Sequence, residues 1–399
     1  MSAAQATIFL IPVLAVLAPL LARGVGVFVR VPVVVFELML GILVGPAVLG
    51  WAAPSEFVEL LSEFGLAMLF FVAGSEIQLS AFRGRTGRRA VGGWFVSIAL
   101  GIAVGWLIAP GEAAIVIAIA LSSTALGTIL PMLRDNGELR TPFGKAVGAI
   151  GAVGEFAPLV AISIFLGGRD PGIATIVLIA FVLVAALAIW WAFRAPQGAL
   201  HRFVNATLHT SGQFAIRVVF LVLGALVVVS LLLDLDMLLG AFTAGIVWRL
   251  VMRDAAAADR DAVESKIEGV AFGFLVPVFF IYTGVTFDLE ALLADPELLL
   301  LLPIGLAGLL LVRGLPSMLA APADSRPRDR AAVVFFGATG LPIIVAVTNI
   351  GVDEKILSSG LAAALVGIGM LSVLVFPVIG TTLRGDAVGA SLPVAEERL

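Results

Sequence analysis

The chain contains no cysteine and only two histidines among its 399 residues. Without cysteine there are no disulfides, thiolate metal sites or cysteine nucleophiles. His201 and His209 both fall in a polar stretch between apolar segments, which argues against a histidine metal site or a Ser-His-Asp triad. No nucleophile–base pair is visible either. The sequence therefore predicts a protein that is not an enzyme, needs no cofactor and has no nucleic-acid partner.

Charge is scarce as well. Only 13% of the residues are charged, whereas 61% are hydrophobic, and soluble domains carry roughly 25% charged residues. Apolar runs recur along the chain at about the 20-residue length that crosses a hydrocarbon core. These runs are solid rather than alternating, so they indicate helices and not the strands of a membrane barrel. The first run, from about residue 7 to 22, follows no basic segment and precedes no clear cleavage site, so it is interpreted as a membrane helix.

The fold class predicted is an all-α, polytopic membrane protein. Hydropathy and the Gly, Pro and charge breaks predict about thirteen spans, at 7–23, 32–50, 58–78, 90–109, 112–133, 142–167, 172–193, 215–233, 236–253, 266–287, 297–321, 329–350 and 354–383.

The basic residues support this count, because cytoplasmic loops collect Lys and Arg. If the N-terminus is outside, almost all of them fall on one side, in groups such as Arg83, Arg85, Arg88 and Arg89 or Arg326, Arg328 and Arg330. Only Arg169 and Lys355 fall on the other side. We therefore expect a cytoplasmic C-terminus in a bacterial inner membrane.

A longer connection at about 194–213 has the composition of a helix lying in the membrane interface. It divides the twelve spans after the first into two sets of six. If these two sets arose by duplication, they would form a repeat of parallel orientation. Alternatively, the spans from 32–50 to 142–167 form an inverted repeat with those from 236–253 to 354–383. The residues alone leave both arrangements open.

Glu155 lies near the centre of the span at 142–167. A charge at the bilayer centre costs about 3 kcal/mol on insertion scales, and such residues normally face a cavity and carry function. Gly148, Gly151 and Gly154 precede it on a face suited to close packing, and Pro158 frees backbone carbonyls one turn earlier. The alternative is a protonated structural glutamate bonded to a neighbour.

Two other charges sit in or beside spans. Arg313 lies within 297–321, and either snorkels to the headgroups or supplies a fixed positive charge near Glu155 or Glu76. Glu76 ends the span at 58–78, where it either supports the site or is simply solvated. Glu37 and Glu63 lie near helix starts and are expected at the interface.

Two spans carry small hydroxyl residues beside helix-breaking residues. Ser123 and Thr124 are followed by Gly127 and Pro131, and Thr339 is followed by Gly340 and Pro342. Ser and Thr often bond only to their own helix, but unwound backbone at membrane depth is tolerated where it lines a cavity. Its freed carbonyls can hold a cation. The pattern predicts two broken helices flanking Glu155.

Six stretches resemble the second family of bacterial monovalent cation:proton antiporters, which includes sodium/proton and potassium-efflux exchangers. They are residues 36–50 (Phe-Glu-Leu-Met-Leu-Gly-Ile-Leu-Val-Gly-Pro-Ala-Val-Leu-Gly), 63–66 (Glu-Phe-Gly-Leu), 74–76 (Gly-Ser-Glu), 120–124 (Ala-Leu-Ser-Ser-Thr), 239–245 (Leu-Gly-Ala-Phe-Thr-Ala-Gly) and 277–284 (Pro-Val-Phe-Phe-Ile-Tyr-Thr-Gly).

The resemblance implies a homodimer whose mobile core moves against a dimerisation domain. The core would comprise 58–167 and 266–350, and the dimerisation domain 7–50, 172–253 and 354–383. It also implies two crossed broken helices, an ion-binding carboxylate at Glu155 and a basic residue at Arg313. The family usually carries Asp, Asn or Gln before its carboxylate, where this chain has Gly154. The cytoplasmic nucleotide-binding domain of many potassium-efflux members is expected to be missing from this chain.

Together these features predict an antiporter that exchanges Na⁺ or K⁺ for H⁺ by alternating access, serving pH homeostasis. Glu155 would bind either ion, with Ser123, Thr124 and Thr339 beside it, and one titrating carboxylate predicts 1:1 electroneutral exchange. The main alternative is a sodium-coupled solute symporter of related broken-helix design. A channel fits two broken helices less well than alternating access does.

Overall fold

The computed structural model describes residues 3–25, 31–77, 84–166, 170–194, 213–253 and 257–385, and these are helices joined by turns and short loops. Within them, ten helices are long and apolar enough to cross a membrane, and three shorter apolar helices accompany them. These thirteen segments correspond to the expected spans, so the all-α polytopic fold is confirmed. His201, His209, the expected interfacial helix, Arg83 and the residues after 385 lie outside the described residues.

Helix ends differ from the predicted spans where local chemistry decides them. The second helix stops at Val44, because Pro46 disfavours helical geometry in the residue before it, instead of continuing to residue 50. The fourth starts at Gly84, and its first turns contain Arg85, Arg88 and Arg89, which lie before the predicted span at 90–109. The expected span at 266–287 likewise begins earlier, at Ala257.

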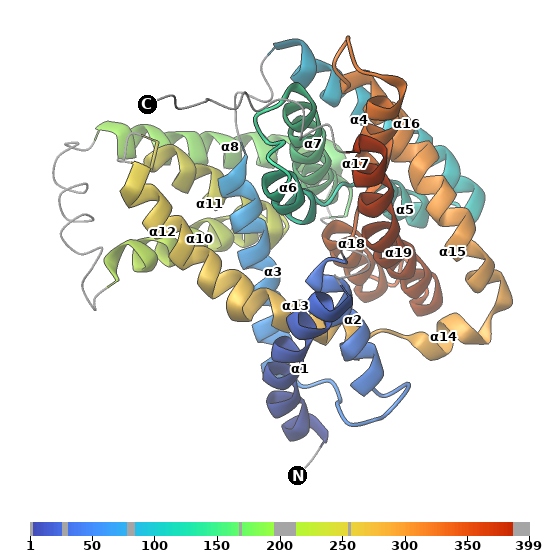
Figure 1. The fold of residues 1–399 in the computed structure, drawn as a ribbon. Coiled ribbons are helices and arrows are strands. Elements are labelled where there is room, and N and C mark those ends of the chain that lie inside the picture. The colour runs from blue at the N-terminus through green and yellow to red at the C-terminus, as the bar shows by residue number, and fades with distance from the viewer. Residues whose placement is uncertain are drawn as a thin grey trace, which may run out of the picture. The chain divides into compact units, whose positions relative to one another are not determined.

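The described chain forms two compact units, which are residues 1–78, 156–298 and 358–363, and residues 79–155, 299–357 and 364–399. Unit 1 contains α1 (Ala3–Val25), α2 (Val33–Val44), α3 (Glu56–Glu76), the second part of α7 (Pro142–Phe165), α8 (Pro171–Arg194), α10 (Phe214–Leu232), α11 (Met237–Val251), α12 (Ala257–Val270), the π-helix η2 (Ala271–Leu275), α13 (Val276–Val285) and α14 (Leu289–Ala294). Figure 1 labels the α-helices of this unit.

In unit 1, α2 packs against α1 and α13, as Figure 1 shows. Two glycines allow the α2 and α13 backbones to touch. A Cβ on Gly41 would lie 2.2 Å from the carbonyl oxygen of Ile281, and one on Gly284 would lie 2.3 Å from that of Leu38. Helices meet at small residues in this way when the surrounding lipid offers no hydrophobic driving force. An apolar cluster that includes Leu14, Val44, Ile281 and Val285 surrounds the contact.

Unit 2 contains both interrupted helices. Its elements are α4 (Gly84–Ile108), α5 (Glu112–Leu121), α6 (Leu126–Asp135), the first part of α7, most of α15 (Pro296–Leu309), the π-helix η3 (Leu310–Gly314), α16 (Leu315–Ser317), η4 (Met318–Ala320), α17 (Pro327–Ala338), α18 (Pro342–Asp353) and most of α19 (Ser359–Arg384). The interrupted segments and α7 are the most buried of the apolar spans. Their irregular backbone is therefore covered by protein, which is the condition for keeping it at membrane depth.

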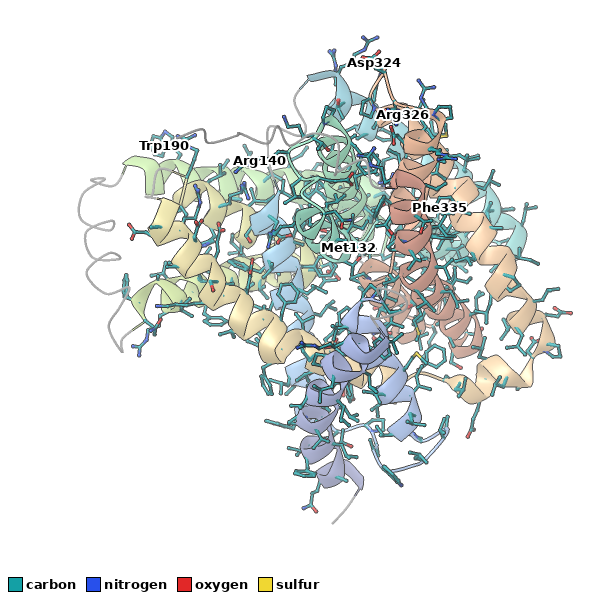
Figure 2. The ribbon with its side chains drawn as sticks, in the orientation of Figure 1. Met132, Arg140, Trp190, Asp324, Arg326 and Phe335 are labelled. Atoms are coloured by element: carbon teal, nitrogen blue, oxygen red, sulfur yellow. The ribbon has the colours of Figure 1, made fainter. Side chains whose placement is uncertain are left out.

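An arginine joins the ends of the interrupted helices in unit 2. Arg384 at the end of α19 donates from Nε to Glu138 Oε1 at 2.8 Å and from Nη1 to Asp329 Oδ1 at 2.6 Å. Its guanidinium also lies 4.2 Å from the ring centroid of Phe143. Glu138 follows α6 and Asp329 is in the first turn of α17. Further along α17, Phe335 packs on Phe376 of α19 with ring centroids 5.7 Å apart, and Figure 2 shows Phe335 on α17.

We expect Gly41→Ala to destabilise the protein by about 1–3 kcal/mol, because the added methyl group overpacks a backbone contact. Gly224→Ala is the matched control. Gly224 also lies in an apolar helix of unit 1 and has no neighbour within 4 Å of a Cβ, so its replacement should be neutral or stabilising. Thermal unfolding in detergent compares the two, and equal melting temperatures would contradict the close contact.

Candidate ion-binding site

Both predicted interruptions are present in unit 2. The first separates Leu121 at the end of α5 from Leu126 at the start of α6, and the second separates Ala338 of α17 from Pro342 of α18. Each break leaves amides at one helix start and carbonyls at another helix end without partners in their own helix.

The second break lies where the sequence placed it, because Gly340 is within the gap and Pro342 opens α18. Proline suits this first helical position, where its missing N–H is not needed. The first break comes earlier than expected, since Gly127 and Pro131 lie inside α6. The hydroxyl of Ser123 bonds to the Ala120 carbonyl at 2.8 Å, and such a bond competes with helical hydrogen bonding at the end of α5.

The two breaks cross each other. Ala125 N donates to Thr339 O at 2.7 Å, and the Thr124 hydroxyl donates to Gly337 O at 2.6 Å. Each break thus supplies hydrogen-bond partners that the other lacks. The predicted crossing of two broken helices is therefore confirmed.

Glu155 lies beside the first break and is only 4% exposed. Its Oε1 accepts hydrogen bonds from the backbone amides of Leu126, at 2.7 Å, and Gly127, at 3.2 Å. These are the first two amides of α6, where the helix dipole presents its positive end. A carboxylate at such a position is stabilised and oriented by the helix that follows.

Pro158 contributes to this arrangement through the backbone of α7. Proline has no N–H, so it cannot donate to the carbonyl four residues earlier, which is that of Gly154. The Gly154 carbonyl instead accepts from Thr124 N at 3.0 Å. The residue before Glu155 is thereby tied to the first break, as the position of Pro158 in the sequence suggested.

The side chain of Arg313, in η3, also contacts the first break. Its side chain is 1% exposed, so it does not snorkel to the headgroups. Nε donates to Thr124 Oγ1 at 2.8 Å and Nη2 donates to Ile150 O at 2.7 Å. Within the described part of the chain Arg313 forms no ion pair, so neutral oxygens rather than a carboxylate hold its guanidinium. Thr124 consequently joins Arg313 to Gly337.

This network explains the glycine at position 154. A Cβ there would lie 2.5 Å from Arg313 Nη2 and 2.6 Å from both Cβ and Oγ1 of Thr124. The space of a side chain at 154 is thus already filled by the guanidinium and the threonine. Gly151, one turn earlier, packs on Leu126, whereas Gly148 has nothing within 4 Å of a Cβ.

The other residues predicted for the site, Ser123, Thr339 and Glu76, do not all turn their side chains toward the two breaks. Ser123 lies against the second break, with Oγ 3.2 Å from the position of a Cβ on Gly340. The Thr339 hydroxyl turns back to its own helix and donates to Phe335 O at 3.0 Å. Glu76 belongs to unit 1, where the neighbouring Ser75 carbonyl accepts from Arg249 at 2.6 Å.

Ser372 is a residue that sequence reasoning missed. It is fully buried in α19, and its Oγ lies 3.1 Å from Gly340 N and 3.0 Å from Gly340 O. It therefore supports the backbone of the second break from a third helix. The sequence carries only a weak indication of this role for Ser372, because a single serine in a long apolar helix usually hydrogen-bonds only to the backbone of its own helix.

We expect Gly154→Ala to displace Arg313 or Thr124 and to lower the stability of the protein by about 1–3 kcal/mol. Gly148→Ala, in the same helix, should leave the stability unchanged or raise it slightly. Melting temperatures in detergent compare the two variants with the wild-type protein. Indistinguishable behaviour would show that Arg313 and Thr124 do not fill this space.

The family model described as "Sodium/hydrogen exchanger, transmembrane" matches residues 13–383. The chain is 25% identical over 397 residues to the putative Na⁺/H⁺ antiporter YjbQ of Bacillus subtilis, in an alignment covering 94% of this chain and 62% of that protein. It is 28% identical over 286 residues to the Na⁺/H⁺-K⁺ antiporter GerN of Bacillus cereus, covering 69% of this chain and 71% of GerN. The chain thus spans somewhat under two thirds of the length of YjbQ.

The fold is similar to a solved structure of the sodium proton antiporter MjNhaP1 from Methanocaldococcus jannaschii. The TM-score is 0.67 at 14% identity, and the match covers 96% of this chain and 100% of the other. The sequence comparisons therefore confirm the resemblance noted in the sequence motifs, and the solved structure confirms the fold. On this basis, the chain belongs to the sodium/hydrogen exchanger family.

Proposed function

We propose that this protein exchanges a monovalent cation, Na⁺ or K⁺, for H⁺ by alternating access, and that Glu155 is the shared binding site. Family membership supports cation:proton exchange. The relatives YjbQ and GerN are named as Na⁺/H⁺ and Na⁺/H⁺-K⁺ antiporters, so both cations are candidates for this chain.

The observation that carries the proposal is the buried carboxylate at the crossing of the broken helices. Glu155 is 4% exposed and its Oε1 accepts from the first amides of α6. A mid-membrane carboxylate held in a fixed orientation, beside backbone that is not regular helix, suits a transported cation. Ser123, Thr124 and Thr339 bring further oxygen atoms to the two breaks.

Coupling follows from competition at one carboxylate. A proton and a monovalent cation each neutralise the Glu155 carboxylate, so a bound proton disfavours binding of the cation and a bound cation disfavours binding of the proton. An empty, ionised Glu155 would carry an uncompensated charge through the membrane, which costs several kcal/mol. Movement between the two faces is therefore restricted to the loaded forms, and each crossing with a cation is followed by one with a proton.

The charge of Arg313 is constant through this cycle, because arginine stays protonated. The site then has the same net charge with a bound proton as with a bound monovalent cation. This equality favours a 1:1, electroneutral exchange. The proposal further includes a homodimer in the bilayer, a core moving against a dimerisation domain, an outside N-terminus and a cytoplasmic C-terminus, as the sequence predicts.

Glu155→Gln should reduce cation-driven proton flux in proteoliposomes to the rate of empty vesicles, because the amide cannot exchange a proton for a cation. Glu155→Asp keeps the charge but shortens its reach to the α6 amides, so it should retain weakened exchange. Glu112→Gln is the control, since Glu112 is exposed at the start of α5. A well-folded Glu155→Gln protein that still exchanges at the wild-type rate would remove Glu155 from its role.

Offering Li⁺, Na⁺, K⁺ and Rb⁺ in turn to the same proteoliposomes should identify the transported cation. With that cation, the exchange rate should be unaffected by an imposed membrane potential, because no net charge crosses. Current, or a rate that changes with the potential, would contradict 1:1 exchange. Cation uptake that requires an added solute and no proton counterflow would instead identify a symporter.

A further inference from the structure

A second acidic residue is buried in unit 1. Glu37 is the only polar residue in α2, and the sequence suggested an interfacial position for it. In the structure it is 6% exposed, so the helix does not present it to water. Its burial needs an explanation, because an ionised carboxylate in an apolar setting is costly.

The helices packed against α2 offer little charge to Glu37. On α1 the only charged residue is Arg23, which is exposed in the last turn. On α13 the only titratable residue is Tyr282, which is hydrogen-bonded to the backbone of Ser55. Among the residues that the structure describes, none forms a hydrogen bond or ion pair with Glu37. Its carboxyl group is therefore not compensated by a neighbour.

Glu37 also lies near a close helix contact, the one between α2 and α13. Gly41, whose backbone touches Ile281 and Gly284, follows Glu37 by four residues. Residues four apart in a helix lie on the same face, one turn from each other. A change in the charge of Glu37 therefore acts within one turn of the contact between α2 and α13.

We propose that Glu37 is a second proton-binding site, which holds a proton in this conformation and links the packing of α1, α2 and α13 to pH. A proton is the ligand that these surroundings fit. It neutralises a carboxylate by itself, whereas a metal cation needs several oxygen ligands, and the residues packed around α2 are mostly apolar. Ionisation at higher pH introduces a charge that the packed helices do not balance.

This inference does not rest on Glu155 being the ion site, because the two carboxylates belong to different units. A proton at Glu155 is exchanged in every transport cycle of the proposed mechanism. A proton at Glu37 instead responds to the pH of its surroundings. Replacing each residue separately distinguishes the two roles.

Infrared spectroscopy of the full-length chain tests the protonation directly. In a Glu155→Gln background at neutral pH, the C=O stretch of a protonated carboxylic acid should be present, and adding Glu37→Gln should remove part of it. Adding Glu56→Gln should leave it unchanged, since Glu56 is exposed at the start of α3. An identical band with and without Glu37 would overturn the proposal.

Thermal unfolding tests the link to packing. Wild-type protein and Glu37→Gln, which keeps the shape of the neutral acid, should melt at similar temperatures at low pH. As pH rises, ionisation should lower the wild-type melting temperature relative to that of Glu37→Gln. Glu56→Gln should follow the wild type throughout. A difference between wild type and Glu37→Gln that is constant with pH would contradict the proposed site.

Discussion

The hydrogen bonds from the first amides of α6 to Glu155 are the interaction on which the rest of the site depends. They place a carboxylate at the positive end of a half-helix inside the membrane, where an uncompensated charge is costly. They also require that the helix be broken, because a continuous helix would use those amides for its own hydrogen bonds. The interruption of α5–α6 and the acidic residue in α7 therefore form one structural feature.

A second constraint holds that feature in place. Thr124 accepts from Arg313, donates to Gly337 and, through its amide, binds the Gly154 carbonyl. One residue of the first break thus touches η3, α17 and α7. Arg313 and Thr124 fill the space that a side chain at position 154 would occupy. The packing therefore requires glycine at this position. Arg313 is thereby held against the residue that precedes Glu155. The proposed electroneutral exchange rests on its constant charge and on Glu155 as the one carboxylate of this site that would exchange a proton for a cation.

Much of this could be predicted from the sequence, because charge, glycine and proline at membrane depth are costly and therefore informative. Glu155, Arg313, the second break at Gly340 and the effect of Pro158 followed from that cost. What failed depended on contacts between distant residues. The first break comes at the serines rather than at Gly127, the support from Ser372 comes from a separate helix, and the buried Glu37 lies in α2, which packs on α13, a helix far from it in sequence. The periodic pattern of apolar residues in a helix does not show which neighbouring element covers a given residue.

The central claim is that Glu155 binds a proton and a cation in competition. Counting the protons released when the transported cation is added to purified protein, in weakly buffered detergent solution, tests it most directly. The account predicts that wild-type protein releases protons as cation binds, with less release at high pH where Glu155 has already lost its proton, and that Glu155→Gln releases none. Saturable cation binding without proton release, or undiminished release from Glu155→Gln, would contradict it.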